Sequence, residues 1–412
     1  KFIIFANLFK IKTMKESNLQ NFVSQYTEPQ KVQAEGLYPY FRVLKSGQYP
    51  VVNYDGKQVL MFGSNSYLGL TNHPQIKEAA KKAIDKYGTG TAGSRFLNGT
   101  IDLHIELEEK LANFVNKEAA LVFSTGFQTN LGVISSITRR NDFLIIDESS
   151  HASIYEGSRL SFSKVLKFKH NNIQSLEETL SKIENDNQNS IKLIIVDGVF
   201  SMEGDIADLP HINELAKKYN ASIMVDDAHG LGVMGNKGKG TVHHFGLDDD
   251  VELIMGTFSK ALSTVGGFIA GSKEVINYLK HNARTIIFSA SLPPASAAAV
   301  IETLNVIDEN PKIIDRLWKN THYAQKLLKE AGFDIGNSQT PIIPIYIKDD
   351  KLTFKYTMEL FSAGVFVNPV IPPAVKEGHS LIRFSMMATH EKEHIEKGIE
   401  ICAKVAKNLG II

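Results

Sequence analysis

Short apolar runs alternate with longer amphipathic segments through the middle of the chain. We predict strands at 119–123, 143–146, 165–168, 191–196, 223–225, 253–255 and 267–270. Nearly every position of the run from 191 to 196 is apolar, which is typical of a strand covered on both faces. Helices are expected to begin near Gly126, His151 and Leu209, between these strands. This alternation predicts an α/β fold in which helices wrap an open, mostly parallel central sheet.

The pattern differs toward both ends of the chain. Pro74 opens a predicted helix after an irregular N-terminal stretch. After Pro293-Pro294 we expect long helices over about 295 to 332, and then strands near 342–347, 365–367 and 382–384 and helices near 354–363 and 391–408. We therefore predict an N-terminal arm over 1–60, a large domain over 61–294 and a small α+β C-terminal domain over 295–412.

One glycine-rich segment matches a known sequence motif for dinucleotide binding. Gly88-Thr89-Gly90-Thr91-Ala92-Gly93 matches the dinucleotide-binding motif letter for letter. That motif must follow a strand and open a helix, whereas this copy follows a predicted helix. We reject the dinucleotide interpretation and expect a flexible turn that brings backbone close to a ligand or a neighbouring subunit.

Composition narrows the class of protein. The 412 residues carry 45 Lys and Arg against 45 Asp and Glu, so no nucleic-acid partner is indicated. Cys402 is the single cysteine, which excludes an intrachain disulfide and indicates a reducing compartment, the cytoplasm. No apolar run approaches the roughly 20 residues that a membrane span needs.

The first residues are apolar and flanked by lysines, from Phe2 to Phe9. No small-residue cleavage site follows clearly, so a secretory signal is a poor interpretation. We favour a packed or fraying arm. A weak helix at the inner face of the cell membrane, and sequence upstream of a start at Met14, are the alternatives.

Polar residues follow several of the predicted strands. Gly126, His151, Ser201, Asp226, His229 and Lys260 all stand at such positions. Ligands of open α/β sheets bind at the carboxyl ends of the strands, so we expect the site there. In Gly256-Thr257-Phe258-Ser259-Lys260 an amine lies among small hydroxyl residues, as a Schiff-base lysine beside a phosphate site would.

The neighbours of that lysine suggest a matching ring site. Asp226 directly follows an apolar strand, where it could pair with a protonated pyridine nitrogen or simply cap the next turn. His229 could reach a ring hydroxyl. His151 could stack on a flat cofactor and act as acid or base, although a lone histidine at a helix start is more often structural. The start of the helix at Gly126 could take a phosphate.

Arg383 lies between Ile382 and Phe384 in a predicted strand. An arginine in an apolar setting needs an anion, either a substrate carboxylate or a structural Asp or Glu. Rival chemistries lack their motifs: there is no G-x-S-x-G elbow, no phosphate loop ending in GK[ST], and no metal-ligand spacing, so no metal is expected.

Several stretches taken together resemble the α-oxoamine synthases, fold-type I transferases that use pyridoxal 5′-phosphate (PLP). They are Ser64 to Leu70, His151-Ala152-Ser153, Asp197 to Asp205, Asp226 to Gly230, Thr257 to Lys260, Phe288 to Pro294, and Arg383 to His390. They come in the family's order and spacing and cover about residues 30 to 405. The resemblance implies that the large domain binds PLP.

The resemblance also implies residue roles. Lys260 would carry PLP as a Schiff base, Asp226 would pair with the pyridine nitrogen, and His151 would stack on the ring. His229 and Ser201 would contact the ring oxygen, and Asn65 and Arg383 would bind the substrate carboxylate. The phosphate would be held by Gly126, Phe127 and Thr257. Ser289 from the other subunit of a homodimer would also contact the phosphate. Lys260 and His151 would be the catalytic residues.

Within the family several acyl transfers compete. Gly93 to Thr100, Phe366 to Pro369 and Met387 to His390 look most like the branch that joins L-serine to palmitoyl-CoA. That reaction yields 3-oxosphinganine, CoA and CO2 at the start of sphingolipid synthesis. Acetylation of glycine is the main alternative, and a catalytically silent subunit is a third hypothesis that Lys260 argues against. Pro372-Pro373-Ala374-Val375 departs from the P-A-T-P form of some members. The resemblance therefore does not predict the conformation of this loop, which closes over the site in those members.

Overall fold

The computed structural model describes residues 17–184 and 189–412. The predictions for the apolar segment from Phe2 to Phe9 therefore lie outside the described residues. In the described part, a seven-stranded sheet has the order β3-β9-β8-β7-β6-β4-β5. Its strands are β3 (Ala119–Phe123), β4 (Phe143–Asp147), β5 (Lys164–Phe168), β6 (Lys192–Asp197), β7 (Ser222–Asp226), β8 (Leu253–Thr257) and β9 (Gly267–Gly271).

The sheet is mostly parallel, as predicted. Strands β5, β4, β6, β7 and β8 pair in parallel, and β9 is antiparallel to both of its neighbours, β8 and β3. The parallel strands end on polar residues at one edge, among them Asp197, Asp226 and Thr257. This edge carries the candidate active site.

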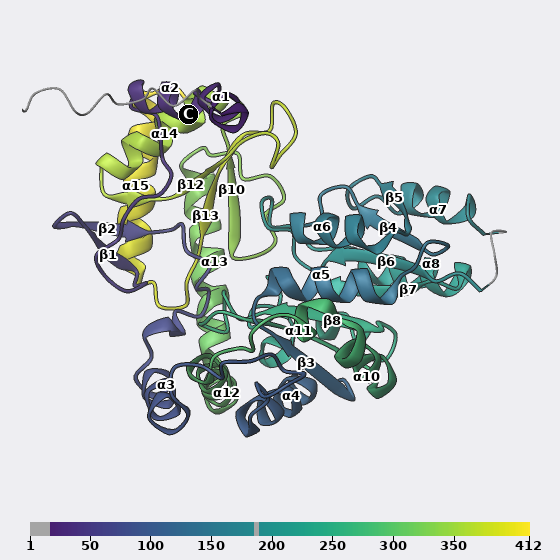
Figure 1. Ribbon diagram of the computed structural model, residues 1–412. Coiled ribbons are helices and arrows are strands. Elements are labelled where there is room, and N and C mark those ends of the chain that lie inside the picture. Colours follow the sequence, from purple (N-terminus) through teal and green to yellow (C-terminus); the bar gives the residue numbers. More distant parts are fainter. Residues whose placement is uncertain (1–16, 185–188) are drawn as a thin grey trace, which may run out of the picture.

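Alternate residues of each central strand pack against opposite layers of helices, as pleated strands require. Leu144 and Ile146 belong to a cluster with one set of helices, and Ile145 belongs to a larger cluster on the other face. The first set lies along the sheet in Figure 1 and comprises α5 (Gly126–Ile137), α6 (Ala152–Ser161), α10 (Lys273–Asn282) and α11 (Arg284–Ile287). The other face packs on α4 (Asp102–Phe114), α7 (Ile173–Ser181), α8 (Leu209–Tyr219) and the nearby α9 (Thr241–His244).

The C-terminal part forms a second body of helices and short strands. Its helices are α12 (Pro294–Glu309), α13 (Lys312–Glu330), α14 (Asp350–Ser362) and α15 (Lys392–Asn408). A three-stranded sheet has the order β10-β13-β12, formed by β10 (Ile342–Tyr346), β12 (Asn368–Val370) and β13 (Leu381–Ser385). We did not predict β12, a three-residue strand whose central residue is Pro369.

The N-terminal arm contains structure that the sequence did not lead us to predict. After α1 (Asn18–Ser24) and α2 (Glu28–Ala34), strands β1 (Val51–Tyr54) and β2 (Lys57–Met61) form a hairpin. Strand β2 also pairs in parallel with β11 (Val365–Phe366), which brings the arm beside the C-terminal part (Figure 1). The hairpin turn is Asp55-Gly56, both with positive φ, a strong two-residue turn signal.

The first long helix begins and ends at the residues that the sequence indicated. Helix α3 (Pro74–Tyr87) has Pro74 in its first turn and ends at Gly88, whose φ is 78°. The glycine-rich segment therefore follows a helix, which confirms that it is no dinucleotide fingerprint. Helix α4 begins at Asp102, and Ile101 holds its N-cap position.

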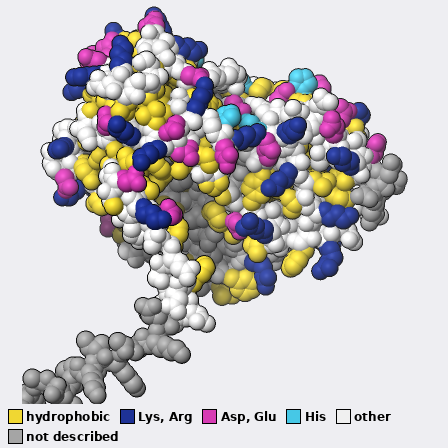
Figure 2. All heavy atoms as spheres, turned by 90° about the horizontal axis from the view of Figure 1, so that it is seen from above, with side chains coloured by type: hydrophobic (Ala, Val, Ile, Leu, Met, Phe, Trp, Pro, Cys, Tyr) yellow, Lys and Arg dark blue, Asp and Glu magenta, His cyan; other side chains and the backbone are white. Residues whose placement is uncertain are grey.

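Lys and Arg side chains intermingle with Asp and Glu on the face shown in Figure 2, in keeping with the balanced composition. Over the described residues, no helix combines the length and apolar character needed to cross a membrane.

Candidate active site

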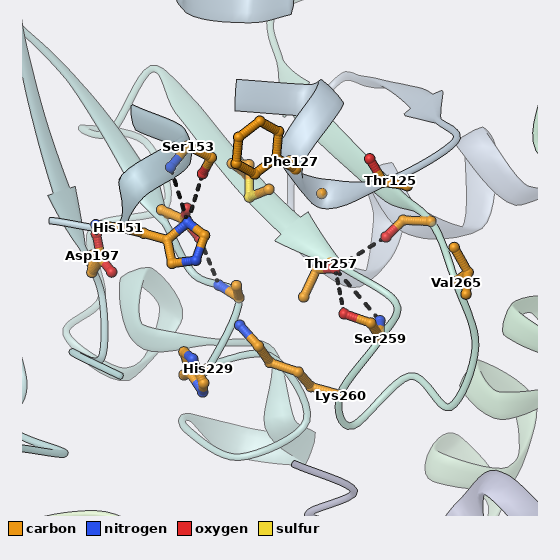
Figure 3. A pocket seen from close by; sticks show the side chains of 15 residues that line it. Thr125, Phe127, His151, Ser153, Asp197, His229, Thr257, Ser259, Lys260 and Val265 are labelled. Atoms are coloured by element: carbon orange, nitrogen blue, oxygen red, sulfur yellow. Dashed lines mark hydrogen bonds between the residues drawn. The ribbon is translucent and has the colours of Figure 1, made fainter. Parts of the chain in front are cut away.

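A cavity of about 300 Å³ opens at the carboxyl ends of the parallel strands (Figure 3). The start of α5, the turn before α6, the ends of β6 and β7 and the turn after β8 all contribute to its lining. Seven predicted site residues line it: Gly126, Phe127, His151, Asp226, His229, Thr257 and Lys260. The structure thus gathers residues that are more than 130 positions apart in the chain into one space.

Lys260 extends into this cavity from the turn that follows β8, toward His229 (Figure 3). Burial lowers the pKa of Lys260 to about 8, although the charges of Asp226 and Asp197 oppose that shift. A lowered pKa leaves more of the amine unprotonated near neutral pH. Lys260 therefore suits nucleophilic attack on a carbonyl and proton abstraction.

The start of α5 and Thr257 form one wall of the cavity. Thr125 caps the helix by accepting a hydrogen bond from the Gln128 N–H at 3.1 Å. The N–H groups of Gly126 and Phe127 have no acceptor within the helix, as at every helix start. A Cβ on Gly126 would lie 2.8 Å from Thr257 Oγ1, so glycine allows the helix start to approach that hydroxyl. Free N–H groups beside a hydroxyl suit a phosphate.

Two carboxylates lie at the ends of neighbouring strands. Asp226 is 4% exposed, and its Oδ2 accepts a hydrogen bond from Asn130 Nδ2 at 2.7 Å. Its Oδ1 accepts from the Ala228 N–H at 3.2 Å. Burial and the nearby charge of Asp226 raise the pKa of Asp197 well above its usual value. Asp226 is therefore held in one orientation, from which it can pair with a cationic ring nitrogen.

His151 is the N-cap residue of α6, and its ring faces the cavity. Its Nδ1 lies 2.7 Å from Ser153 Oγ and accepts the Ser153 backbone N–H at 3.3 Å (Figure 3). Burial lowers the pKa of His151, with the charge of Asp226 opposing the shift. A neutral imidazole with an open face can stack on a flat ring.

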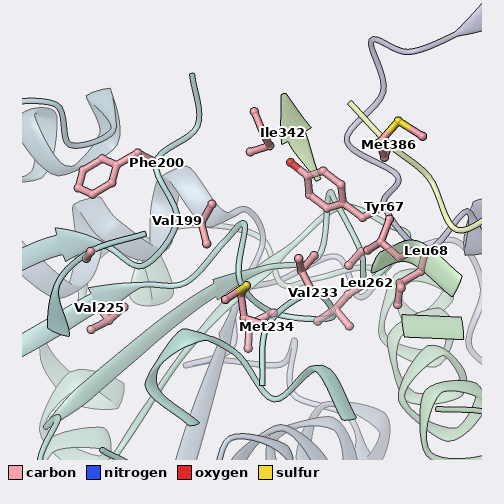
Figure 4. Close-up of a cluster of buried hydrophobic side chains, with 14 of the residues drawn as sticks. Tyr67, Leu68, Val199, Phe200, Val225, Val233, Met234, Leu262, Ile342 and Met386 are labelled. Carbon is pink, nitrogen blue, oxygen red and sulfur yellow. The ribbon is translucent and has the colours of Figure 1, made fainter. Parts of the chain in front are cut away.

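His229 is joined to Arg383 through the hydroxyl of Tyr67. That hydroxyl lies 2.7 Å from His229 Nδ1 and accepts from Arg383 Nη2 at 3.0 Å. The ring of Tyr67 lies in a buried apolar cluster near Leu68 and Leu262 (Figure 4), so its hydroxyl position is well defined. Burial lowers the pKa of His229 well below its usual value, and the charges of Lys260 and Arg383 add to that shift.

Arg383 is 6% exposed and binds neutral acceptors. Its Nε donates to the Ser201 carbonyl at 2.6 Å, and its Nη1 donates to Ser385 Oγ at 2.7 Å. With the Tyr67 hydroxyl, these acceptors orient the guanidinium without supplying an opposite charge. Three of its five N–H donors are used in this way, which leaves capacity for an anion.

Four predicted site residues do not line the cavity, and Arg383 is one of them. Ser201 lines an adjoining groove of about 920 Å³, which His151 shares. Asn65 Oδ1 is buried without a hydrogen-bond partner among the described residues. Ser289 lies outside the cavity of its own chain, and its Oγ accepts from Gln128 Nε2 at 3.3 Å.

Sequence reasoning gave no role to Asn130, Ser153, Tyr67 or Asp197, which all contact the site residues. One signal was present for Asn130. It is a fully buried amide in the apolar helix α5, one turn after Gly126, and a buried polar group needs partners. Tyr67 gave no such signal, because its contacts depend on how distant segments pack.

Comparison with known proteins agrees with this geometry. Residues 57–401 match the family described as Aminotransferase class I and II. The serine palmitoyltransferase of Sphingobacterium spiritivorum is 53% identical over 398 residues, which cover 97% of this chain and 99% of the relative. The 8-amino-7-oxononanoate synthase of Petrotoga mobilis is 46% identical over 385 residues, covering 93% and 98%.

A solved structure gives the same result for the fold. The serine palmitoyltransferase of S. paucimobilis, a lysine-to-alanine variant with a bound PLP–myriocin aldimine, has a TM-score of 0.92. The two sequences are 32% identical, and the match covers 96% of this chain and 100% of that one. The chain therefore belongs to the aminotransferase class I and II family, in its α-oxoamine synthase group, and has the fold-type I architecture.

Proposed function

We propose that this protein is a PLP-dependent acyltransferase that condenses L-serine with palmitoyl-CoA. The products are 3-oxosphinganine, CoA and CO2, at the first step of sphingolipid synthesis. The observation that carries the substrate pair is the 53% identity with a serine palmitoyltransferase over 97% of the chain. The cavity supplies the chemistry that such a reaction needs.

The residues of the cavity fit PLP in each of its parts. The phosphate suits the N–H groups of Gly126 and Phe127 with the Thr257 hydroxyl. The pyridine nitrogen suits Asp226, the ring face suits His151, and the aldehyde suits the amine of Lys260. His229 and Ser201 are assigned to the ring oxygen, and Ser289 of a second subunit to the phosphate.

When bound, PLP supplies an electron sink that stabilises negative charge on the Cα of an amino acid. The chain's own residues then direct the proton and the substrates. Lys260 takes the Cα proton through Nζ, because its lowered pKa makes a neutral amine available near pH 7. His151 donates a hydrogen bond to the oxygen on which negative charge develops during acyl transfer.

The serine carboxylate is assigned to Arg383 and Asn65. Arg383 is buried, is held by neutral groups and has unused donors, so an incoming carboxylate would supply the missing negative charge. Asn65 could donate to the same carboxylate through Nδ2, whereas its buried Oδ1, which lacks a partner among the described residues, can only accept and suits the amine or hydroxyl of serine. The carboxylate of bound serine would therefore use the donors that Arg383 leaves free.

We further propose a homodimer. Large apolar side chains are exposed around the cavity mouth and the segment before Pro294: Phe96 (54%), Leu97 (77%), Phe127 (45%), Val265 (57%) and Phe288 (77%). The Ser291 N–H donates to the Gly93 carbonyl at 3.0 Å, which joins the segment of Phe288 to the loop of Phe96 and Leu97. A second copy would cover this patch and bring Ser289 to the site. Light scattering with size-exclusion chromatography tests whether the protein is a dimer.

Contact of this protein with a membrane surface stays a prediction.

The decisive experiment incubates the purified protein with L-serine and palmitoyl-CoA and seeks 3-oxosphinganine by mass spectrometry. Lys260→Ala is expected to fold, to lack the visible absorbance of the Schiff base between Lys260 and PLP before serine is added, and to give no product. Lys404→Ala, which removes an exposed lysine from α15, is the matched control and should behave as wild type. Turnover by the Lys260→Ala protein would refute the assignment of Lys260.

Parallel reactions separate the proposal from related activities. Glycine with acetyl-CoA tests the main alternative, and alanine with pimeloyl-CoA tests the activity named for the relative from Petrotoga mobilis. If only one of these two reactions gave product, the substrates would be reassigned to that pair. The residues assigned to PLP would stay the same. No product from any pair, with no PLP absorbance, would favour a catalytically silent subunit.

A further inference from the structure

A chain of hydrogen bonds joins Asp226 and His151, two residues that line the cavity. Asn130 Nδ2 lies 2.7 Å from Asp226 Oδ2 and 2.8 Å from Ser153 Oγ. Ser153 Oγ in turn lies 2.7 Å from His151 Nδ1. Asn130 and Ser153 are 0% and 1% exposed, so water does not compete for these contacts. A catalytic role for this chain of hydrogen bonds rests on the proposed function, because it would organise that same site.

The direction of each hydrogen bond follows from the chemistry of the groups. An ionised Asp226 can only accept, so the Asn130 atom facing it must be the NH2 nitrogen. That nitrogen has two hydrogens, and the second is directed at Ser153 Oγ. Asn130 Oδ1 is buried with no partner in the described residues, so the amide is oriented for its two donors at the expense of its acceptor. Ser153 thus accepts from Asn130 and keeps its own hydrogen for His151.

The same reasoning assigns the protonation of His151. The Ser153 backbone N–H points at Nδ1 from 3.3 Å and can only donate. Nδ1 must therefore present a lone pair, and the Ser153 hydroxyl donates to that atom as well. A neutral imidazole has one N–H, so the proton is on Nε2.

We propose that Ser153 is a positioning residue that, with Asn130, holds His151 as the neutral tautomer protonated on Nε2. This tautomer presents an N–H donor at Nε2, away from the Nδ1 that Ser153 occupies. The other tautomer would turn the donor toward Ser153 and leave Nε2 able only to accept. Asn130 also links this histidine to Asp226, because it donates to both Asp226 and Ser153. The hydrogen bonds therefore fix the orientations of His151 and Asp226 relative to each other.

The charged groups near His151 do not by themselves select a tautomer. Asp226 favours the protonated ring and Lys260 disfavours it, and Asp197 accepts the backbone N–H of His151 at 3.2 Å and not a ring atom. They influence whether the ring is charged. The contacts of Ser153 decide which nitrogen carries the proton of the neutral ring.

The test is nitrogen NMR of the holoenzyme labelled with 15N-histidine. The chain has 13 histidines, and the His151 signals are those missing from a His151→Gln spectrum. In the wild type we expect Nδ1 to resonate as an unprotonated nitrogen and Nε2 as a protonated one. In Ser153→Ala we expect the balance to move about fivefold toward the other tautomer, the effect of one net hydrogen bond. Ser153→Thr keeps a hydroxyl and should retain the wild-type signals.

Kinetics provide a second readout. Ser153→Ala should lower kcat, by up to about fivefold, with little change in the KM for serine, because the donor acts on developing charge. Ser158→Ala is the matched control: it removes another buried hydroxyl from α6, one that donates to the Tyr155 carbonyl. It should leave both the His151 signals and kcat unchanged.

A wild-type spectrum with the proton on Nδ1 would overturn the proposal, even if no Ser153 variant folds. Unchanged His151 signals in a folded Ser153→Ala protein would also overturn it. The NMR result does not depend on turnover. Absence of 3-oxosphinganine together with the expected spectra would therefore remove the proposed function and leave the role of Ser153 standing.

Discussion

The lowered pKa of Lys260 makes a quantitative prediction about its reactivity. At pH 7 an amine with a pKa of about 8 is about one-tenth unprotonated, whereas an ordinary lysine with a pKa of 10.5 is unprotonated in about three molecules per ten thousand. In the cofactor-free protein at pH 7, the unprotonated, nucleophilic fraction of Lys260 should therefore be about 300 times that of a free lysine side chain.

Trace acetylation at a series of pH values measures this directly. Mass spectrometry follows the peptide that contains Lys260, and Nα-acetyl-lysine amide in the same tube is the reference amine. The labelling rate of Lys260 should rise up to about pH 8 and then level off. The reference should continue to rise to above pH 10.

A variant tests the cause of the shift. The charge of Asp226 raises the pKa of Lys260 against the larger effect of burial, so Asp226→Asn should move the midpoint to lower pH. The reasoning would be refuted if Lys260 followed the reference amine up to pH 10.5, or if Asp226→Asn raised the midpoint.

Two further predictions concern stability. Burial opposes protonation of His170, but hydrogen bonds to Asp147 and Asp205 raise its pKa to about 10, so its stabilisation is complete below pH 6.5 and is lost as the pH rises toward 10. His170→Gln should remove about 3 kcal/mol of that pH dependence in urea unfolding, and an unchanged slope would contradict the assignment. Arg95→Met should lower the free energy of unfolding by about 3 kcal/mol, because it leaves the Glu108 carboxylate, which is only 13% exposed, without the guanidinium that lies 2.7 Å away. Adding Glu108→Gln should recover part of the loss, and an additive double variant would count against the pair.

Much of the large domain could be predicted because its signals are local. The run from 191 to 196 has the continuous apolar character of a strand between two layers, and β6 spans Lys192–Asp197. The cavity follows from topology, since parallel strands end at one edge and their terminal polar residues meet there. Lys260, Asp226 and His151 were predicted to lie together for that reason, and they line one cavity.

The missed features depend on contacts between distant segments. Tyr67 contacts His229 and Arg383 because three separate parts of the chain pack together. The residues next to Tyr67 in sequence do not predict these contacts. The buried setting of Arg383 was predicted, but its actual acceptors are neutral, a choice that local sequence does not encode. The proposed division of the chain at 60/61 and 294/295 stays a prediction.

The pairing of β2 with β11 has a consequence for how the chain reaches its folded state. Asn368 Nδ2 donates to the Gly63 carbonyl across 305 residues, beside the ladder that joins the two strands. During synthesis β1 and β2 emerge first, and the strands of the central sheet, which all precede residue 272, can pair with one another before β11 is made. Strand β2 must wait with an open edge until β11 leaves the ribosome. Such a long wait exposes an unpaired strand to other chains, so protection of this hairpin by a chaperone should improve the yield of folded protein.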